Sequence, residues 1–222
     1  DGDGDDPSCG DGVIEAGEFC YLESPSILVG RPSFGIAAFD MNHDGHQDLV
    51  LSDSELGGPG VHLGDGAGNF GEEIGSGAGP DPIYVPFRVA VGPIADEDPD
   101  VAVSSLLGSS RLFRGDGAGA TNFVNLGLNA TFGWDVLLTQ LDDSAPLDLV
   151  QLVGSGLYIS QGAAAPEGFT GSTWMPYPFA ENIEEQAEPV GIAVGQLSGD
   201  DAEDLVGTDQ IEQSLVVFEG DG

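Results

Sequence analysis

One stretch decides the fold of this chain: Asp40-Met41-Asn42-His43-Asp44-Gly45-His46-Gln47-Asp48-Leu49-Val50. Oxygen-bearing side chains stand at alternate positions and once more near its end, at Asp40, Asn42, Asp44 and Asp48. Gly45 lies where a short loop has to turn sharply. The flanking residues 34–39 and 49–51 are short, apolar and close to glycine, which is typical of strands rather than helices. The stretch therefore predicts a polar loop between two β-strands.

The spacing of the oxygen side chains indicates a cation site. A hard cation such as Ca²⁺ takes about six to eight oxygen ligands, and four side chains plus the backbone carbonyl of His46 supply them from one loop. Carboxylates this close repel one another in the absence of a cation. The loop is not an EF-hand, because Leu51 stands where that loop needs Glu. We predict a Ca²⁺ site; the alternative is a turn rich in Asp, Asn and Gly that binds no ion.

Composition restricts the possible partners. The chain has 222 residues, 39 acidic side chains, four Arg and no Lys, and its formal net charge is −35. A surface of this sign repels nucleic acid and anionic membranes, so we expect no nucleic-acid partner and no membrane insertion. With 40% hydrophobic residues, the chain is too apolar for a disordered acidic polymer, and the charges should coat a folded body.

The two cysteines, Cys9 and Cys20, lie close together in the N-terminal segment, after an acidic tether at residues 1–8. An isolated pair of this kind predicts one small disulfide and an oxidising compartment. No stretch reaches the length of a transmembrane helix. We therefore expect a secreted or bacterial cell-surface protein whose signal peptide has been removed.

From residue 31 onward the chain repeats itself. An Asp followed by two apolar residues recurs at Asp48, Asp100, Asp148 and Asp204, at intervals of 52, 48 and 56 residues. An apolar strand precedes and follows each Asp, a Gly-rich turn comes next, and a further strand begins near Phe70, Phe123 or Phe169. Four short strands in a unit of about 50 residues predict an all-β fold made of β-propeller blades. We place the repeats at 31–79, 80–128, 129–178 and 179–222, after an N-terminal region 1–30.

The repeat unit resembles the FG-GAP or VCBS repeat of integrin-α-type propellers. Phe34-Gly35 and the segment from Asp40 to Leu49 carry the resemblance, which is specific in the first repeat and weaker in the others. It implies calcium binding by the side chains of Asp40, Asn42, Asp44 and Asp48 and by the carbonyl of His46. The segment from Cys9 to Cys20 resembles a short disulfide repeat of bacterial secreted and surface proteins.

The other repeats carry poorer ligand sets. Repeat 4 offers Gln196, Ser198, Asp200 and Asp204, and repeat 3 offers Gln140, Asp142, Ser144 and Asp148. Repeat 2 has Pro93 at the first ligand position and a loop that is one residue shorter. Each replacement removes charge or a ligand oxygen, which lowers calcium affinity. We predict one good site in repeat 1 and one weaker site in repeat 4, at Ser198, Asp200 and Asp204.

The last repeat ends before its fourth strand, and the segment 17–22 resembles the start of that strand in repeat 1. We predict four blades closed by a strand around residues 19–22, which leaves no open sheet edge. Two alternatives stay open: the chain is part of a ring of about seven blades, or the N-terminal strand completes a neighbouring molecule's blade and forms polymers.

No nucleophile, phosphate-binding or zinc motif is found in the sequence. The three histidines are His43, His46 and His62, and the first two lie in the predicted calcium loop. We therefore expect no enzyme but a calcium-binding extracellular module for adhesion, interaction or assembly, with a protein or glycan ligand or with itself as partner. The alternative is a polysaccharide lyase or hydrolase, or a lectin, with its site at the propeller mouth.

Overall fold

The computed structural model describes the chain in ranges, and the statements on structure below concern these residues. They are 29, 32–53, 58–76, 85–94, 96–107, 110–124, 133–142, 146–154, 156–163, 168–176, 189–199, 202–210 and 213–220. Cys9, Cys20 and the predicted strand at residues 19–22 lie outside them. Within these ranges no helix forms, so they contain no helix that could cross a membrane.

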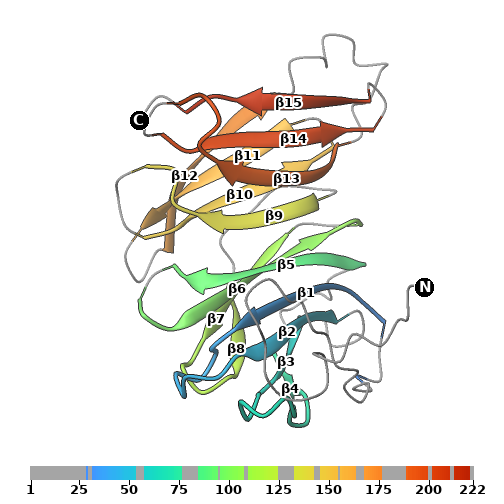
Figure 1. Cartoon of the computed structure of the whole chain (residues 1–222), viewed down its shortest axis with the longest axis vertical. Helices are drawn as coiled ribbons and strands as arrows, with labels where there is room; N and C mark the ends of the chain where they lie inside the picture. Colours follow the sequence, from blue (N-terminus) through green and yellow to red (C-terminus); the bar gives the residue numbers. More distant parts are fainter. Residues whose placement is uncertain are drawn as a thin grey trace, which may run out of the picture.

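The described residues form fifteen strands, which pair into four antiparallel sheets (Figure 1). Sheet 1 contains β1 (Ser33–Phe39), β2 (Asp48–Asp53), β3 (Pro59–His62) and β4 (Ile74–Gly75). Sheet 2 contains β5 (Pro86–Pro93), β6 (Pro99–Ser105), β7 (Arg111–Gly115) and β8 (Thr121–Val124). Sheet 3 contains β9 (Gly133–Thr139), β10 (Asp148–Val153), β11 (Gly156–Ala163) and β12 (Gly168–Pro176). Sheet 4 contains β13 (Pro189–Gly195), β14 (Asp204–Asp209) and β15 (Ser214–Phe218).

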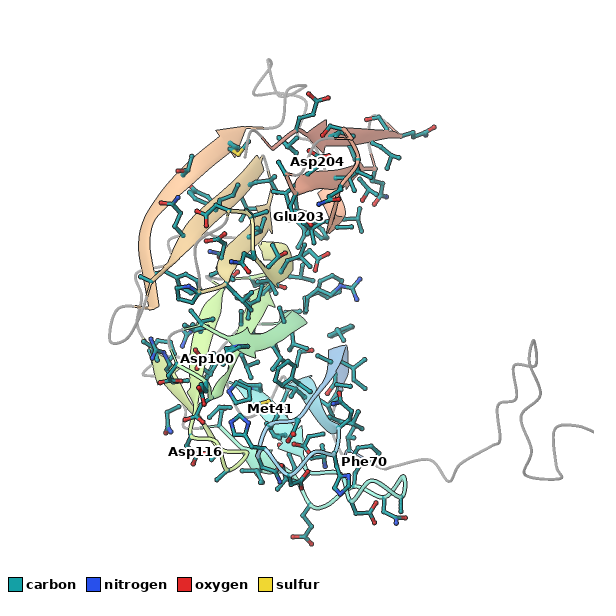
Figure 2. The ribbon with its side chains drawn as sticks, turned by 60° about the vertical axis from the view of Figure 1, so that its left-hand side comes forward. Met41, Phe70, Asp100, Asp116, Glu203 and Asp204 are labelled. Atoms are coloured by element: carbon teal, nitrogen blue, oxygen red, sulfur yellow. The ribbon has the colours of Figure 1, made fainter. Side chains whose placement is uncertain are left out.

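In each sheet, strands that are neighbours in sequence are also neighbours in space. The first strands of successive sheets also contact one another, β1 with β5, β5 with β9 and β9 with β13. The sheets therefore follow one another in an arc, with sheet 1 at one end and sheet 4 at the other (Figures 1 and 2). Among the described residues, no closure between sheets 4 and 1 is detected.

Hydrophobic side chains fill the three junctions between neighbouring sheets. Val50 and Val61 of sheet 1 pack with Val101 and Phe113 of sheet 2. Equivalent clusters join sheet 2 to sheet 3 and sheet 3 to sheet 4. Because successive side chains of a strand point to opposite faces, a sheet between two others buries both sets. This burial explains why the second strands contain consecutive apolar residues, such as Leu49-Val50-Leu51 in β2 and Val101-Ala102-Val103 in β6.

The start of each first strand is irregular, and a hydroxyl group stabilises it in three sheets. Register shifts occur near the beginnings of β1, β5 and β13. Ser52 Oγ accepts hydrogen bonds from the backbone N–H groups of Phe34 and Gly35, at 3.1 and 2.8 Å. Ser104 and Thr208 accept equivalent bonds in sheets 2 and 4. These hydroxyls satisfy the donors that a β-bulge leaves out of the strand pairing.

Gly35 is required by the close approach of two sheets. A Cβ atom at this position would lie 2.7 Å from the carbonyl oxygen of Phe87 in β5. The ring of Phe34 lies 5.9 Å from that of Phe87, measured between centroids. The Phe-Gly pair therefore acts at the junction of sheets 1 and 2: glycine lets the strands approach, and phenylalanine covers the contact.

The structure confirms the prediction of an all-β chain built from several small, repeated antiparallel sheets. Sheet 4 has three strands in the described part of the chain. Closure by a strand around residues 19–22 falls outside that part and stays a prediction.

Candidate functional site

The loop from Asp40 to Asp48 joins β1 to β2, and its side chains are bonded to its own backbone. Asp40 accepts hydrogen bonds from the backbone N–H groups of Asp44 and Gly45, at 3.1 and 2.9 Å. Asn42 Oδ1 also accepts from the Asp44 N–H, at 3.1 Å. His43 and Gly45 have positive φ angles of 59° and 86°, so the loop turns tightly. The oxygens of Asp40 and Asn42 therefore gather around one turn, as the sequence spacing predicts.

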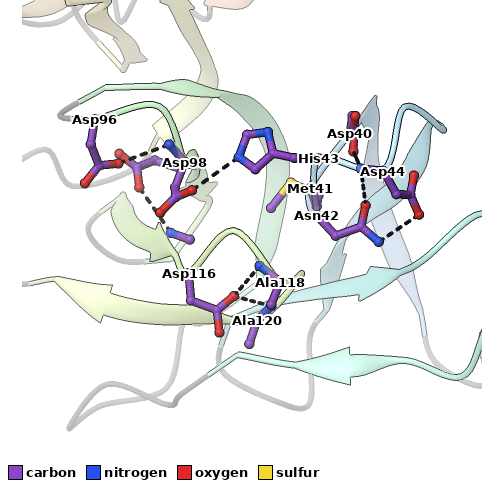
Figure 3. Close-up of polar contacts among 12 residues, drawn as sticks. Asp40, Met41, Asn42, His43, Asp44, Asp96, Asp98, Asp116, Ala118 and Ala120 are labelled. Atoms are coloured by element: carbon purple, nitrogen blue, oxygen red, sulfur yellow. Dashed lines mark hydrogen bonds and ion pairs between the residues drawn. The ribbon is translucent and has the colours of Figure 1, made fainter.

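Asp44 closes the exposed side of this loop (Figure 3). Its Oδ2 accepts a hydrogen bond from Asn42 Nδ2 at 2.9 Å, and its Oδ1 accepts the His46 N–H at 2.8 Å. Donation by Asn42, followed by that from His46, lowers the pKa of the Asp44 carboxyl below its ordinary value. The carboxylate is therefore charged at neutral pH and accessible to a cation.

Asp48 differs from the other residues of the loop because it is fully buried, with an exposed fraction of 0%. Its Oδ2 accepts the backbone N–H of Met41 at 2.8 Å, and its Oδ1 accepts that of Gly64 at 2.7 Å. One carboxylate thus joins the loop before β2 to the turn after β3. Both oxygens satisfy buried donors, and the side chain fixes the site's position.

A buried carboxylate recurs at the same place in every sheet. We call the four buried carboxylates Asp48, Asp100, Asp148 and Asp204 the bridging aspartates; each is at most 1% exposed. Asp148 joins the N–H groups of Leu141 and Gly162, at 2.9 and 2.8 Å. Asp204 joins those of Leu197 and Gly220, at 2.6 and 2.9 Å. Asp48, Asp148 and Asp204 therefore each hold the loop after the first strand against the turn after the third. Asp100 is bonded to the turn, through the Gly115 N–H.

Glycine is required opposite each bridging aspartate. A Cβ atom on Gly64 would overlap the carbonyl oxygen of Gln47, which directly precedes Asp48. Gly115, Gly162 and Gly220 meet the corresponding carbonyls of Pro99, Leu147 and Glu203 in the same way. The bond to the carboxylate brings the turn so close that no side chain fits. The sequence signal for this arrangement is an Asp paired with a Gly 14–16 residues later.

The sequence interpretation did not find this structural role. It assigned Asp48 and Asp204 to calcium sites and took the recurring Gly as part of Gly-rich turns, whereas the structure joins each Asp to a Gly by a hydrogen bond. The signal that could have revealed this role is that each recurring Asp is followed by a recurring Gly at nearly the same distance along the chain.

Sheet 2 contains the weakest of the four bridges. The Gly115 N–H donates to Asp100 Oδ1 at 3.1 Å, while Asp100 Oδ2 lies 3.7 Å from Arg114 Nε. Among the described residues, this second oxygen has no hydrogen-bond partner. Burial raises the pKa of Asp100 to about 6, although the Gly115 N–H and the Arg114 charge act in the opposite direction.

The predicted weaker site in sheet 4 is seen in part. Ser198 is described, and its backbone N–H donates to Asp204 Oδ2 at 2.7 Å. Hydrogen bonds from Gly220, Leu197 and Ser198 lower the pKa of the Asp204 carboxyl. Asp200 lies outside the described residues. Asp204 and Ser198 therefore lie together, with the carboxylate serving as a bridging aspartate.

The Gly-rich turns after β3 and β7 share one geometry. Asp65 Oδ1 accepts the N–H groups of Ala67 and Asn69, and Asp116 Oδ1 accepts those of Ala118 and Ala120. Figure 3 shows the second of these turns beside the loops of sheets 1 and 2. Across that boundary, His43 Nε2 lies 3.2 Å from Asp98 Oδ1. The loops at this edge of sheets 1 and 2 therefore contact each other directly.

The donor set of the first loop fits a hard cation in its chemistry. Asp40, Asn42 and Asp44 offer oxygen atoms at one exposed turn. The buried Asp48 holds the start of that turn through the Met41 N–H. Within the described ranges, no three His, Cys, Asp or Glu side chains converge closely enough to hold a metal ion. Asn42 and the His46 carbonyl are not among these residue types, so an oxygen-ligated site depends on them and on reorientation of Asp44.

Comparisons with known proteins find similarity among solved structures. No protein-family model matches the chain, and no curated protein matches it. A chain of the Photorhabdus luminescens Tc holotoxin pore is similar over 86% of this chain, with a TM-score of 0.51 and 15% identity. The similarity covers 9% of the toxin chain. At this identity it concerns the fold alone.

Proposed function

We propose that the four sheets are blades of a β-propeller of the FG-GAP or VCBS type. The serial sheets, the contacts between their first strands and the Phe34-Gly35 packing support this proposal. An arc of sheets that bury their faces against one another is the arrangement from which a propeller ring is built.

We propose that Ca²⁺ binds at the loop between β1 and β2. Asp40, Asn42 and Asp44 would bind through their side chains and His46 through its carbonyl, with Asp48 contributing a further oxygen or fixing the loop. The observation that carries this proposal is the gathering of exposed oxygen side chains at one turn fixed by a buried carboxylate. A weaker site in sheet 4 would use Ser198, Asp200 and Asp204.

The function we propose is that of a secreted or cell-surface module that binds a protein or glycan without catalysing a reaction. The net charge of −35 supports a calcium-rich extracellular setting, because divalent cations bind to and screen such a surface. A disulfide between Cys9 and Cys20 would suit the same compartment.

The ring beyond the described arc has three predicted forms. A strand around residues 19–22 closes four blades, the chain forms part of a larger ring, or the strand completes another molecule's blade. The described residues form an open arc of four sheets, and the strand around residues 19–22 that would close four blades lies outside them, so all three forms stay predictions.

Thermal unfolding with and without calcium tests the proposed function. At a calcium concentration of about 100 times the Kd, binding adds about 2.7 kcal/mol to the free energy of unfolding. For a chain of this size, the melting temperature should rise by about 5–10 °C over the value in chelator. Asp44→Ala, with an affinity about tenfold lower or more, should remove about half of this shift or more. A melting temperature that is the same in calcium and in chelator would contradict the proposal.

A further inference from the structure

The first strands of the four sheets lie side by side and share one position near their beginnings (Figure 1). In each sheet, this position directly follows the residue that pairs with the last residue of the second strand. It is occupied by Phe34 of β1, Phe87 of β5, Trp134 of β9 and Val190 of β13. Three of the four sheets therefore carry an aromatic residue here.

The next position distinguishes the two middle sheets from the two at the ends of the arc. Sheets 1 and 4 have Gly35 and Gly191 at this position, whereas sheets 2 and 3 have Arg88 and Asp135. One cation and one carboxylate thus follow the aromatic residues of neighbouring strands.

Arg88 is the exposed arginine of the described ranges, in which Arg111 and Arg114 are partly buried. Its guanidinium carbon lies 4.7 Å from the centroid of the Phe87 ring. Arg114 lies 3.7 Å from Asp100, but within the described ranges Arg88 forms no such ion pair, although the chain has 39 acidic residues. The ring attracts the guanidinium and orients it, while its N–H groups can donate to a ligand.

Phe34 adds an accessible aromatic surface to this cation. Its side chain is 56% exposed, and its ring centroid lies 5.9 Å from that of Phe87. Trp134, in contrast, packs into the junction of sheets 3 and 4. The accessible ring of Phe34 and the guanidinium of Arg88 therefore lie on either side of Phe87's contacts, one apolar and one rich in hydrogen-bond donors.

Asp135 supplies hydrogen-bond acceptors beside Arg88. Its two oxygens accept the N–H groups of Val136 and Ile192, at 2.9 and 3.1 Å, which hold the carboxylate in place and leave further lone pairs on both oxygens. Burial raises the pKa of Asp135, while the bonds from Ile192 and Val136 and the charge of Arg88 act in the opposite direction. The cation and the carboxylate are thus close enough to interact.

The backbone that leads into β5 is strained. Val85 has a φ of 52°, which is rare for a β-branched residue, and its carbonyl accepts the Leu106 N–H at 3.1 Å. Strain of this kind persists where the surrounding structure enforces it, and it is common at binding sites. Here it lies two residues before Phe87 and three before Arg88.

We infer that Phe34, Arg88 and Asp135 form a binding site for a neutral glycan, which rests on the proposed binding function and names its ligand class. The C–H face of a sugar ring packs on Phe34, and its hydroxyl groups accept from Arg88 and donate to Asp135. The net charge of −35 repels an acidic glycan, and Asp135 offsets the charge of Arg88. Phe34 stands near the beginning of β1, whereas the proposed calcium loop follows its end.

The labelled full chain is first applied to an array of neutral and uronic-acid-containing glycans, and the best neutral oligosaccharide is then titrated by calorimetry. Phe34→Ala should weaken binding about tenfold or more, because it removes the stacking surface. Phe34→Leu, which keeps an apolar contact with Phe87 but has no flat ring, should also weaken it. Leu215→Ala is the control: its side chain is 68% exposed on β15, and its loss should leave affinity unchanged.

The polar contacts are tested at Arg88. Arg88→Ala should weaken binding about threefold to tenfold, whereas Arg88→Gln, which keeps N–H donors without the charge, should retain most of the affinity. Melting temperatures of all variants show whether the fold is kept. Unchanged affinity in both Phe34 variants would overturn the inference.

The two proposals fail in distinguishable ways. If no neutral glycan binds, or if only uronic-acid glycans bind and Arg88→Gln loses them, the inference is wrong, whatever calcium does to the melting temperature. If calcium leaves the melting temperature unchanged while a neutral glycan binds and Phe34→Ala releases it, the calcium site is wrong and the inference is supported.

Discussion

The loops that precede β2 and β6 occupy equivalent places in sheets 1 and 2, but they are held by their aspartates in different ways. Asp48 accepts two backbone hydrogen bonds, at 2.7 and 2.8 Å, and joins loop and turn. Asp100 accepts one, at 3.1 Å, and directs its other oxygen towards Arg114 at 3.7 Å. Both side chains are fully buried.

The difference follows from loop length and from one neighbouring residue. The loop of sheet 2 is one residue shorter and begins at Pro93, so its backbone approaches the carboxylate differently. Arg114 stands where sheet 1 has Leu63, and its charge offsets part of the missing hydrogen bonding. The comparison teaches that the bridging aspartate is primarily a structural element, since it remains where the ligand pattern is lost.

The largest expected effect is that of removing Asp48. Asp48→Ala leaves the N–H groups of Met41 and Gly64 without acceptors and should lower the free energy of unfolding by about 3–5 kcal/mol. Asp100→Ala leaves one such donor and should cost about 1–3 kcal/mol. Urea unfolding followed by circular dichroism measures both. Equal losses in the two variants would show that the second hydrogen bond of Asp48 adds nothing.

The next effect concerns the glycines. Gly64→Ala places a Cβ against the carbonyl of Gln47 and should cost about 3 kcal/mol, because the backbone has to move. Gly45→Ala is the matched control: its φ is 86°, but open space surrounds its Cβ position, so only backbone strain of about 1–2 kcal/mol is expected. If Gly45→Ala is the more destabilising change, close approach is not the reason for glycine at position 64.

Sequence reasoning predicted the all-β class and the repeated sheets because strand periodicity and turn residues are local signals. It also located the loop at Asp40 to Asp48, whose alternating side chains the structure gathers at one turn. It could not reveal the bridge from Asp48 to Gly64, because that bond depends on how far the third strand brings its turn back.

Calcium affinity should depend on the loop of sheet 1 and not on the equivalent loop of sheet 2. Asp44→Ala removes a proposed oxygen ligand from the first loop and should weaken calcium binding about tenfold or more. Asp96→Ala, in the loop of sheet 2, removes the same charge and should change the affinity less than twofold, because that loop lacks the ligand pattern. Isothermal titration calorimetry measures both. At the weaker site of sheet 4, Asp200→Ala should have a smaller effect than Asp44→Ala.

The smallest expected effect is a difference in pH dependence. Burial raises the pKa of Asp100 to about 6, above its ordinary value of 3.8 in the unfolded chain. A raised folded-state pKa means that the contribution of this group to stability is fully present below pH 4 and is lost as the pH rises through 6. Asp100→Asn stays neutral throughout. The wild type should therefore gain stability relative to Asp100→Asn when the pH falls from 7.5 to 5.

The control for this measurement is a second buried carboxyl. Burial also raises the pKa of Asp135, whose oxygens accept the N–H groups of Val136 and Ile192, at 2.9 and 3.1 Å. Asp135→Asn should therefore reproduce the sign of the Asp100→Asn result, with the wild type gaining stability relative to either variant as the pH falls. Differences in melting temperature between each variant and the wild type cancel the general relief of charge repulsion at low pH. If the wild type gains no stability relative to Asp100→Asn between pH 7.5 and 5, the weaker bridge of sheet 2 has no electrostatic consequence.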